Sequence, residues 1–155
     1  MPLSPSVTNA FHADHAACLC ASYRRWTGKD LVVASSDRSL AESLYRSAEV
    51  VLSHDTSPDP LFNYANLAGQ ELFEMDWAKV ITTPSRFSAE PVNREERARL
   101  MTTVSEQGYI DNYRGVRISA TGKRFLIERA TVWNVLNESK ELIGQAATFD
   151  HWIPL

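Results

Sequence analysis

The side chains in this sequence that are most able to bind a ligand are three arginines, a tyrosine and an isoleucine: Arg86, Arg117, Arg129, Tyr113 and Ile127. A guanidinium group presents its N–H donors in a planar fork that matches the oxygens of a carboxylate or a phosphate. If these side chains line one pocket between a sheet and its helices, we expect the pocket to take a small anionic metabolite. The alternative is that the arginines pair at the surface with Asp111, Glu128 or Glu90, where ion pairs contribute little.

The histidines do not follow a pattern typical of an enzyme. They are spread over three regions of the sequence: His12, His15, His54 and His151. His54 is followed by Asp55, but neighbours in sequence do not make the spatial triad that a nucleophile such as Ser53 or Ser85 would need. The sequence also lacks a glycine-rich phosphate loop, a paired-cysteine zinc motif and a nucleophile elbow. We therefore do not expect catalytic residues.

A metal site has only weak support. His12, His15 and Cys18 recur every three residues and could meet on one flank of a helix. Three ligands from one helix, without a distant partner, are also what an ordinary amphipathic helix produces. Cys18 and Cys20 would point about 200° apart on a helix, which disfavours a disulfide between them. We expect two reduced thiols and no metal.

Composition indicates one globular domain. The 155 residues are 44% apolar and 23% charged, which is ordinary for a folded protein. The net charge of −3 provides no basic field for nucleic acid. The sequence contains no apolar run near the ~20 residues of a membrane span, and its first residues do not resemble a secretory signal. We expect a cytoplasmic protein without a nucleic-acid or membrane partner.

Two helices are expected in residues 1–48. An apolar stripe that includes Phe11, Leu19 and Trp26 predicts the first helix, and Gly28 is a natural end for it. Ser35 or Ser36 is expected to cap the second. Each helix has one apolar face, so we interpret residues 1–48 as an extension that packs on the core or pairs with a second subunit.

The middle of the chain combines short strands and helices. Strands are expected near residues 50–52 and 61–64, and Asn66 and Asp76 are expected to cap two short helices. Asn93 and Glu96 have the spacing of a capping box, which predicts the start of a longer helix that ends at Gly108.

Three further strands are expected to form a meander over residues 109–119, 123–135 and 142–149. Alternation in the second strand places Phe125, Ile127, Trp133 and Val135 on one face, with Arg129 as the polar exception. Gly144 would let a ligand or another backbone approach closely. We therefore expect an α+β fold: a five-stranded antiparallel sheet with helices on one face, plus the N-terminal helices. Residues 49–150 would form this domain, and residues 151–155 a tail.

Three blocks of the sequence carry a family resemblance: DPLFNYAN at residues 59–66, PSRFSAEPVNREER at 84–97 and VWN at 132–134. They resemble the MEKHLA domain, a PAS-like domain that occurs alone in bacteria and algae and at the C-terminus of plant class III homeodomain-leucine zipper proteins. The resemblance covers about residues 40–149, although the hexapeptide that names the domain is absent. It implies a PAS-like fold with a sensory or regulatory role, here of the stand-alone type. The chain has no homeodomain and no zipper heptads, so the resemblance does not imply DNA binding.

PAS domains as a class bind flavin, haem or small metabolites. Light-sensing flavin domains place a reactive cysteine before an Arg-Phe pair, whereas this chain has Ser85 there. Arg117 and Ile127 stand where such domains use asparagines to hold the flavin, and residues 93–108 contain no histidine for haem. The resemblance therefore implies neither flavin adduct chemistry nor haem, and leaves the ligand unknown.

Two functions follow. The first is a sensory module that binds a small molecule and signals through its flanking helices, a dimer interface or a signalling protein. The alternative is a protein-interaction module that forms dimers without a ligand.

Overall fold

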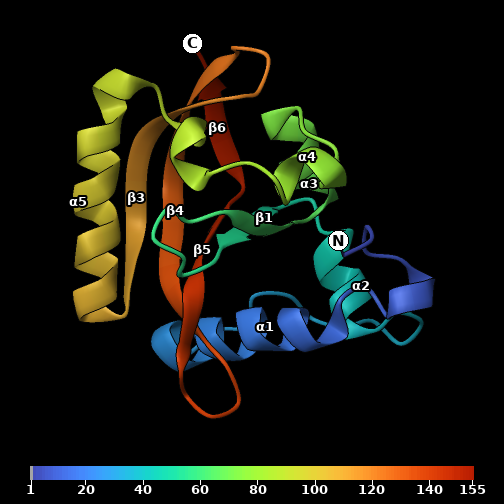
Figure 1. Ribbon diagram of the computed structural model, residues 1–155. Coiled ribbons are helices and arrows are strands. Elements are labelled where there is room, and N and C mark those ends of the chain that lie inside the picture. Colours follow the sequence, from blue (N-terminus) through green and yellow to red (C-terminus); the bar gives the residue numbers. More distant parts are fainter. Residues whose placement is uncertain (1) are drawn as a thin grey trace.

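An antiparallel sheet of six strands forms the centre of the computed structural model, which describes residues 2–155 (Figure 1). The strands are β1 (Val50–His54), β2 (Phe62–Ala65), β3 (Tyr109–Ile118), β4 (Arg124–Leu136), β5 (Leu142–Phe149) and β6 (His151–Pro154). The α-helices are α1 (Ala13–Thr27), α2 (Leu40–Tyr45), α3 (Leu67–Phe73), α4 (Trp77–Val80) and α5 (Pro91–Gln107). Two 3₁₀ turns, η1 (Val7–Asn9) and η2 (Ser85–Ser88), complete the fold.

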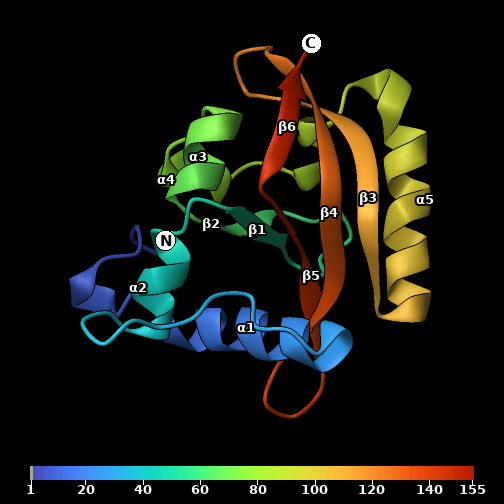
Figure 2. The same cartoon turned by 180° about the vertical axis from the view of Figure 1, so that it is seen from behind.

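The strand order is β2-β1-β5-β4-β3, and β6 adds to β4. β4 has 13 residues, more than the 8 residues of β5 can cover. β6 pairs with the part of β4 that β5 leaves free, from Phe125 to Glu128. Figure 2 shows β6 beside β4 near the C-terminus. The sheet therefore has one strand more than expected, and residues 151–154 form that strand instead of a tail.

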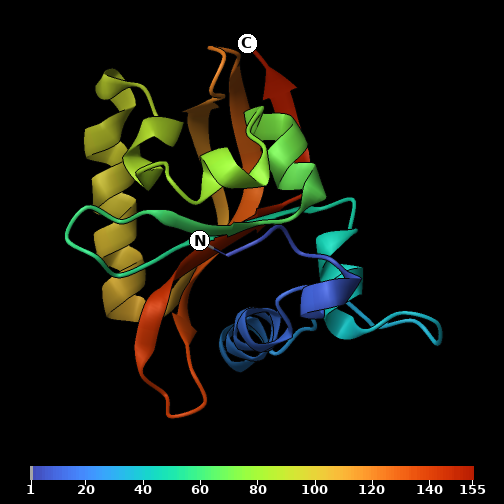
Figure 3. The same cartoon turned by 45° about the vertical axis from the view of Figure 1, so that its right-hand side comes forward.

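Helices cover both faces of the sheet. Alternation along β1 turns Val50 to one face, under α3, α4 and α5, and Val51 to the other, under α1 and α2. Figure 3 shows α1 and α2 together, apart from α3 and α4. The N-terminal helices do pack on the core, but on the face opposite to the other helices. We call the face under α3 to α5 the inner face.

A β-bulge at Arg129 reverses the alternation of β4. Arg129 has φ of 52° and interrupts the register with β3. Before the bulge Ile127 faces inward, and after it Val132 faces inward whereas Trp133 faces α1. The expectation that Ile127 and Trp133 share a face is therefore wrong, because one extra residue inverts every later side chain.

The helix ends follow their capping residues with two exceptions. Asn66 and Asp76 cap α3 and α4 as expected, accepting from backbone N–H groups at 3.0 and 2.9 Å. α2 is capped by Ser39, not by Ser35 or Ser36. α5 begins at Pro91 instead of after Asn93, because proline at the first helical position has its φ already set.

α1 is joined to the sheet by His15. Its Nε2 lies 3.0 Å from Oγ of Ser53. That hydroxyl donates to Asn63 at 2.6 Å, so it accepts from His15. His12 lies outside the helix and contacts the carbonyl of Leu3. Within residues 2–155 no group of three or more His, Cys, Asp or Glu side chains is placed to hold a metal. None of the helices in the same residues is long and apolar enough to span a membrane.

Candidate functional site

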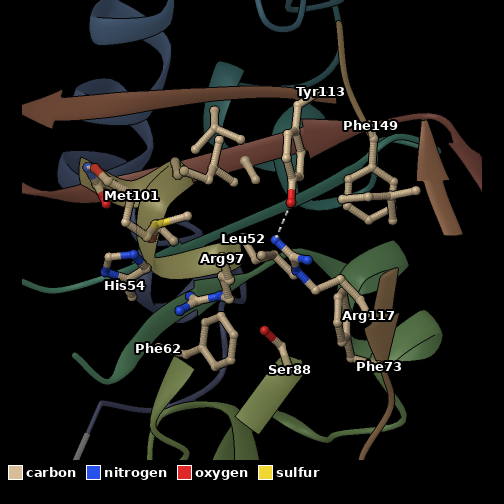
Figure 4. Close-up of a pocket in the computed structure, with 17 residues that line it drawn as sticks. Leu52, His54, Phe62, Phe73, Ser88, Arg97, Met101, Tyr113, Arg117 and Phe149 are labelled. Atoms are coloured by element: carbon tan, nitrogen blue, oxygen red, sulfur yellow. Dashed lines mark hydrogen bonds between the residues drawn. The ribbon is translucent and has the colours of Figure 1, made fainter. Parts of the chain in front are cut away.

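A cavity lies between the inner face of the sheet and the helices (Figure 4). It offers about 50 Å³ to the centres of water-sized molecules. Its polar lining consists of residues from three strands, η2 and α5: Ser53, His54, Ser88, Arg97, Tyr113, Arg117 and Gln145. The rest of the lining is apolar, so the cavity is a mainly hydrophobic space with a few polar groups, as in ligand pockets generally.

The structure brings together three of the five predicted site residues. Tyr113, Arg117 and Ile127 line the cavity. Arg86 is exposed and pairs with the carboxylate of Asp59 at 3.0 Å, outside the cavity. Arg129 is exposed at the β4 bulge. The expected convergence of Arg86, Arg117 and Arg129 does not occur, because Arg86 lies in a surface turn and the bulge turns Arg129 outward.

Arg117 is nearly completely buried, with 6% of its surface exposed. Its guanidinium donates to the carbonyl of Val116 at 2.8 Å and to the hydroxyl of Tyr113 at 3.2 Å. That hydroxyl donates in turn to the carboxylate of Glu96 at 2.9 Å. Glu96 therefore interacts with Arg117 only indirectly, through the hydroxyl of Tyr113. Arg117 has further N–H groups that can donate on its cavity side.

Arg97 is one of the cavity residues that sequence reasoning missed, together with His54, Ser88 and Gln145. Its guanidinium forms no hydrogen bond or ion pair with any residue from 2 to 155 within the usual distance limits. Burial, and then the neighbouring charge of Arg117, lower the pKa of Arg97 to about 10. The spacing could have indicated this. Arg97 lies three positions before Leu100 and seven before Val104, so it is on the same face of the helix as these two residues.

A wider groove adjoins the cavity. It has a volume of about 460 Å³, and Phe62, Phe73 and Ser88 line both spaces. Lys79 and Arg94 add positive charge to its walls, and Glu90 adds a negative charge. Phe62, Phe73 and Ser88 therefore belong to the wall of both the cavity and the groove.

Flavin does not fit this cavity. Pockets for drug-sized ligands measure roughly 300–1,000 Å³, whereas the cavity offers about 50 Å³. Ser85, at the position of the reactive cysteine of flavin photosensors, is buried and its amide donates to the carbonyl of Pro60 at 2.8 Å. α5 contains no histidine for haem. The residues present thus suit a much smaller guest.

Comparison with known sequences gives one family and several plant relatives. The sequence model of the MEKHLA domain matches residues 13–154. The homeobox-leucine zipper protein ATHB-15 of Arabidopsis thaliana is 24% identical over 139 residues, which is 88% of this chain and 17% of that protein. ATHB-14 of the same plant is 27% identical over 136 residues, covering 84% and 16%. The chain spans about a sixth of the length of these relatives.

Comparison with solved structures gives PAS and light-oxygen-voltage domains. The PAS domain of a protein from Colwellia psychrerythraea superposes with a TM-score of 0.61 at 14% identity, over 74% of this chain and 92% of that one. A light-oxygen-voltage domain studied with a flavin analogue gives a TM-score of 0.59 at 16% identity, over 77% and 86%. An RNA-binding light-oxygen-voltage receptor also gives 0.59, at 17% identity over 79% and 38%. These similarities establish the α+β PAS-like fold.

Proposed function

The chain belongs to the MEKHLA domain family, and on that premise we propose that it is a PAS-like sensory module whose inner cavity binds a small anion. The bound state would be transmitted to the N-terminal helices. The observation that carries this proposal is a pair of cations, the buried Arg117 and the partly buried Arg97, which line one cavity without direct contact with a carboxylate in residues 2–155. A charge that is largely removed from water without a partner is costly, and an anion would supply the partner.

The cavity is joined to α1 by a polar network. Gln145 lines the cavity, and its side-chain N–H₂ lies 3.1 Å from each of three acceptors: the carbonyl of Met101, the hydroxyl of Ser105 and the side-chain oxygen of Asn134. An amide nitrogen carries two hydrogens, so three acceptors compete for them. A ligand that changes which acceptors Gln145 bonds to would alter the position of Asn134. The backbone carbonyl of Asn134 accepts a hydrogen bond from the indole of Trp26 in α1 at 2.9 Å, so the change would reach α1.

Thermal unfolding with added anions tests the binding step. We expect millimolar acetate, glycolate or phosphate to raise the melting temperature above that in sodium chloride of equal ionic strength. An anion at about ten times its Kd adds about 1.4 kcal/mol, which is about 3–6 °C for a domain of this size. Arg97→Gln should abolish the rise.

The matched control is Arg99→Gln, because Arg99 is an exposed arginine of the same helix, paired only with Glu95. If both variants keep the wild-type response, the anion binds elsewhere and the proposal is wrong. Unchanged melting temperatures with every anion would also contradict it.

A second candidate function is supported by β6. Within the described part of the chain, β6 pairs with β4 alone, which leaves its other edge free. Ile153 and Leu155 expose 42% and 62% of their surface there. A free strand edge with exposed apolar side chains can pair with a second copy of the chain. Sedimentation equilibrium decides this candidate: a dimer that Ile153→Lys dissociates supports it, and a monomer at all concentrations rejects it.

A further inference from the structure

His54, which lines the cavity, carries an acceptor that no described residue uses. Its Nδ1 lies 2.9 Å from the backbone carbonyl of Asp55. A carbonyl only accepts hydrogen bonds, so Nδ1 must carry the proton. Nε2 of the neutral ring then presents a lone pair. That atom is buried and has no hydrogen-bond partner among residues 2–155.

The surroundings keep this ring neutral. Burial lowers the pKa of His54, and the positive charge of Arg97 lowers it further, against the hydrogen bond to Asp55, which raises it. At neutral pH the ring of His54, a residue of the cavity lining, therefore has an unused lone pair and no charge. Only a group that carries an O–H or N–H can satisfy it, because a bare anionic oxygen has no proton to donate.

Arg97 and Arg117 require the opposite kind of group, a hydrogen-bond acceptor. Figure 4 shows the guanidinium groups of Arg97 and Arg117 in the same space, with His54 on the side of Arg97. Both groups are donors only, so they call for oxygens that accept, preferably charged ones. An ammonium group next to Arg97 would be repelled. The complementary ligand thus has an anionic group for the arginines and a hydroxyl for His54.

The size of the cavity and its apolar walls restrict the class of ligand further. A water molecule needs about 10–15 Å³ of such space, so a cavity of about 50 Å³ takes a guest of about three to five heavy atoms. Leu52, Leu100 and Phe149 on the walls favour a guest with a carbon skeleton over a bare inorganic dianion.

We infer that the cavity selects short α-hydroxycarboxylates, the carboxylate contacting Arg97 and Arg117 and the hydroxyl donating to Nε2 of His54. This inference rests on the proposed function and adds the class of ligand to it. Glycolate is the smallest member of the class, and acetate is its counterpart without the hydroxyl.

Isothermal titration of the full chain with glycolate, acetate and phosphate tests the inference at pH 7.5. We expect glycolate to bind at least about tenfold more tightly than acetate, since one hydrogen bond is worth about a factor of ten. His54→Phe should reduce this ratio to about one. His54→Gln, which returns an acceptor, should restore part of the preference.

The comparison of glycolate with acetate tests this inference separately from the proposed function on which it rests. Equal affinities for glycolate and acetate on the wild-type protein would overturn the inference and leave anion binding intact. Tighter binding of phosphate than of glycolate would also overturn it, in favour of an inorganic oxyanion. If none of the three ligands binds, the proposed function itself fails. The comparison on the wild-type protein decides these outcomes even if a His54 variant does not fold.

Discussion

Gly144 lies directly against the backbone carbonyl of His54, with no room for a Cβ atom between the two residues. The contact joins β5 to the end of β1. It also places the His54 ring at the cavity wall. The glycine that sequence reasoning linked to a close backbone approach therefore positions a residue of the candidate site.

Gly144→Ala should destabilise the protein by about 2 kcal/mol or more, because the added methyl group must displace β1 backbone. Urea unfolding measures this change. Gly122→Ala is the comparison: a Cβ there meets open space, but φ is 95°, so that variant reports backbone strain alone, about 1 kcal/mol. A smaller loss for Gly144→Ala than for Gly122→Ala would contradict the steric account.

Arg97→Met should stabilise the protein in the absence of small anions, by about 1–2 kcal/mol. The substitution removes a partly buried cation near Arg117 and keeps an unbranched side chain on the face of α5 that carries Leu100 and Val104. Arg99→Met, on the exposed side of the same helix, should change the unfolding free energy by less than about 0.5 kcal/mol. A marked loss of stability in Arg97→Met would indicate that the guanidinium has a structural partner.

Acid should loosen α1 through His15. Burial, with a smaller contribution from His12, lowers the pKa of His15 from 6.5 to about 4. As the pH falls, His15 is protonated in the unfolded chain before it is protonated in the folded protein. The contribution of neutral His15 to the free energy of unfolding is therefore complete above pH 6.5 and is lost as the pH falls toward 4. The loss amounts to about 3 kcal/mol at most. His15→Gln should therefore have a shallower decline in unfolding free energy between pH 7 and 4.5 than the wild type, measured by urea denaturation. Parallel curves would contradict this assignment.

Gln145→Leu should separate binding from transmission. Leucine fills the same side of the cavity but cannot bond to Asn134 or the end of α5. We expect the anion still to bind, while the fluorescence change of Trp26 that accompanies binding is lost. Trp26→Phe in the wild-type background identifies the signal of that indole. A fluorescence response in Gln145→Leu equal to that of the wild type would rule out this route.

The element order and most helix caps could be predicted from local signals. Asn66, Asp76 and Gly28 act within one turn of the chain, where residue type determines the geometry. The start of α5 could not be read this way, since Asn93 and Pro91 offer competing signals and proline prevails.

The candidate site was only partly predictable, because it depends on the register of β4. Periodicity does not reveal the bulge at Arg129, a left-handed residue between the pairs that Ile127 and Ala130 form with β3. Arginines and acids alternate around Arg97, which is typical of a solvated helix face and conceals a side chain that lines the cavity. Its contact with the cavity depends on how α5 lies across the sheet. His54 likewise acquires its free acceptor from the path of β1, which no local pattern reveals.

The central claim is that Arg97 and Arg117 bind one small anion, and the side-chain Nε–Hε signals of the arginines report on it most directly. In a nitrogen-15-labelled sample titrated with glycolate, we predict saturable shifts of the Arg97 and Arg117 signals with a common Kd. The Arg86 signal, which belongs to an exposed arginine paired with Asp59, should not follow that curve. Signals of Arg97 and Arg117 that stay in place while the exposed arginines drift without saturation would contradict the claim.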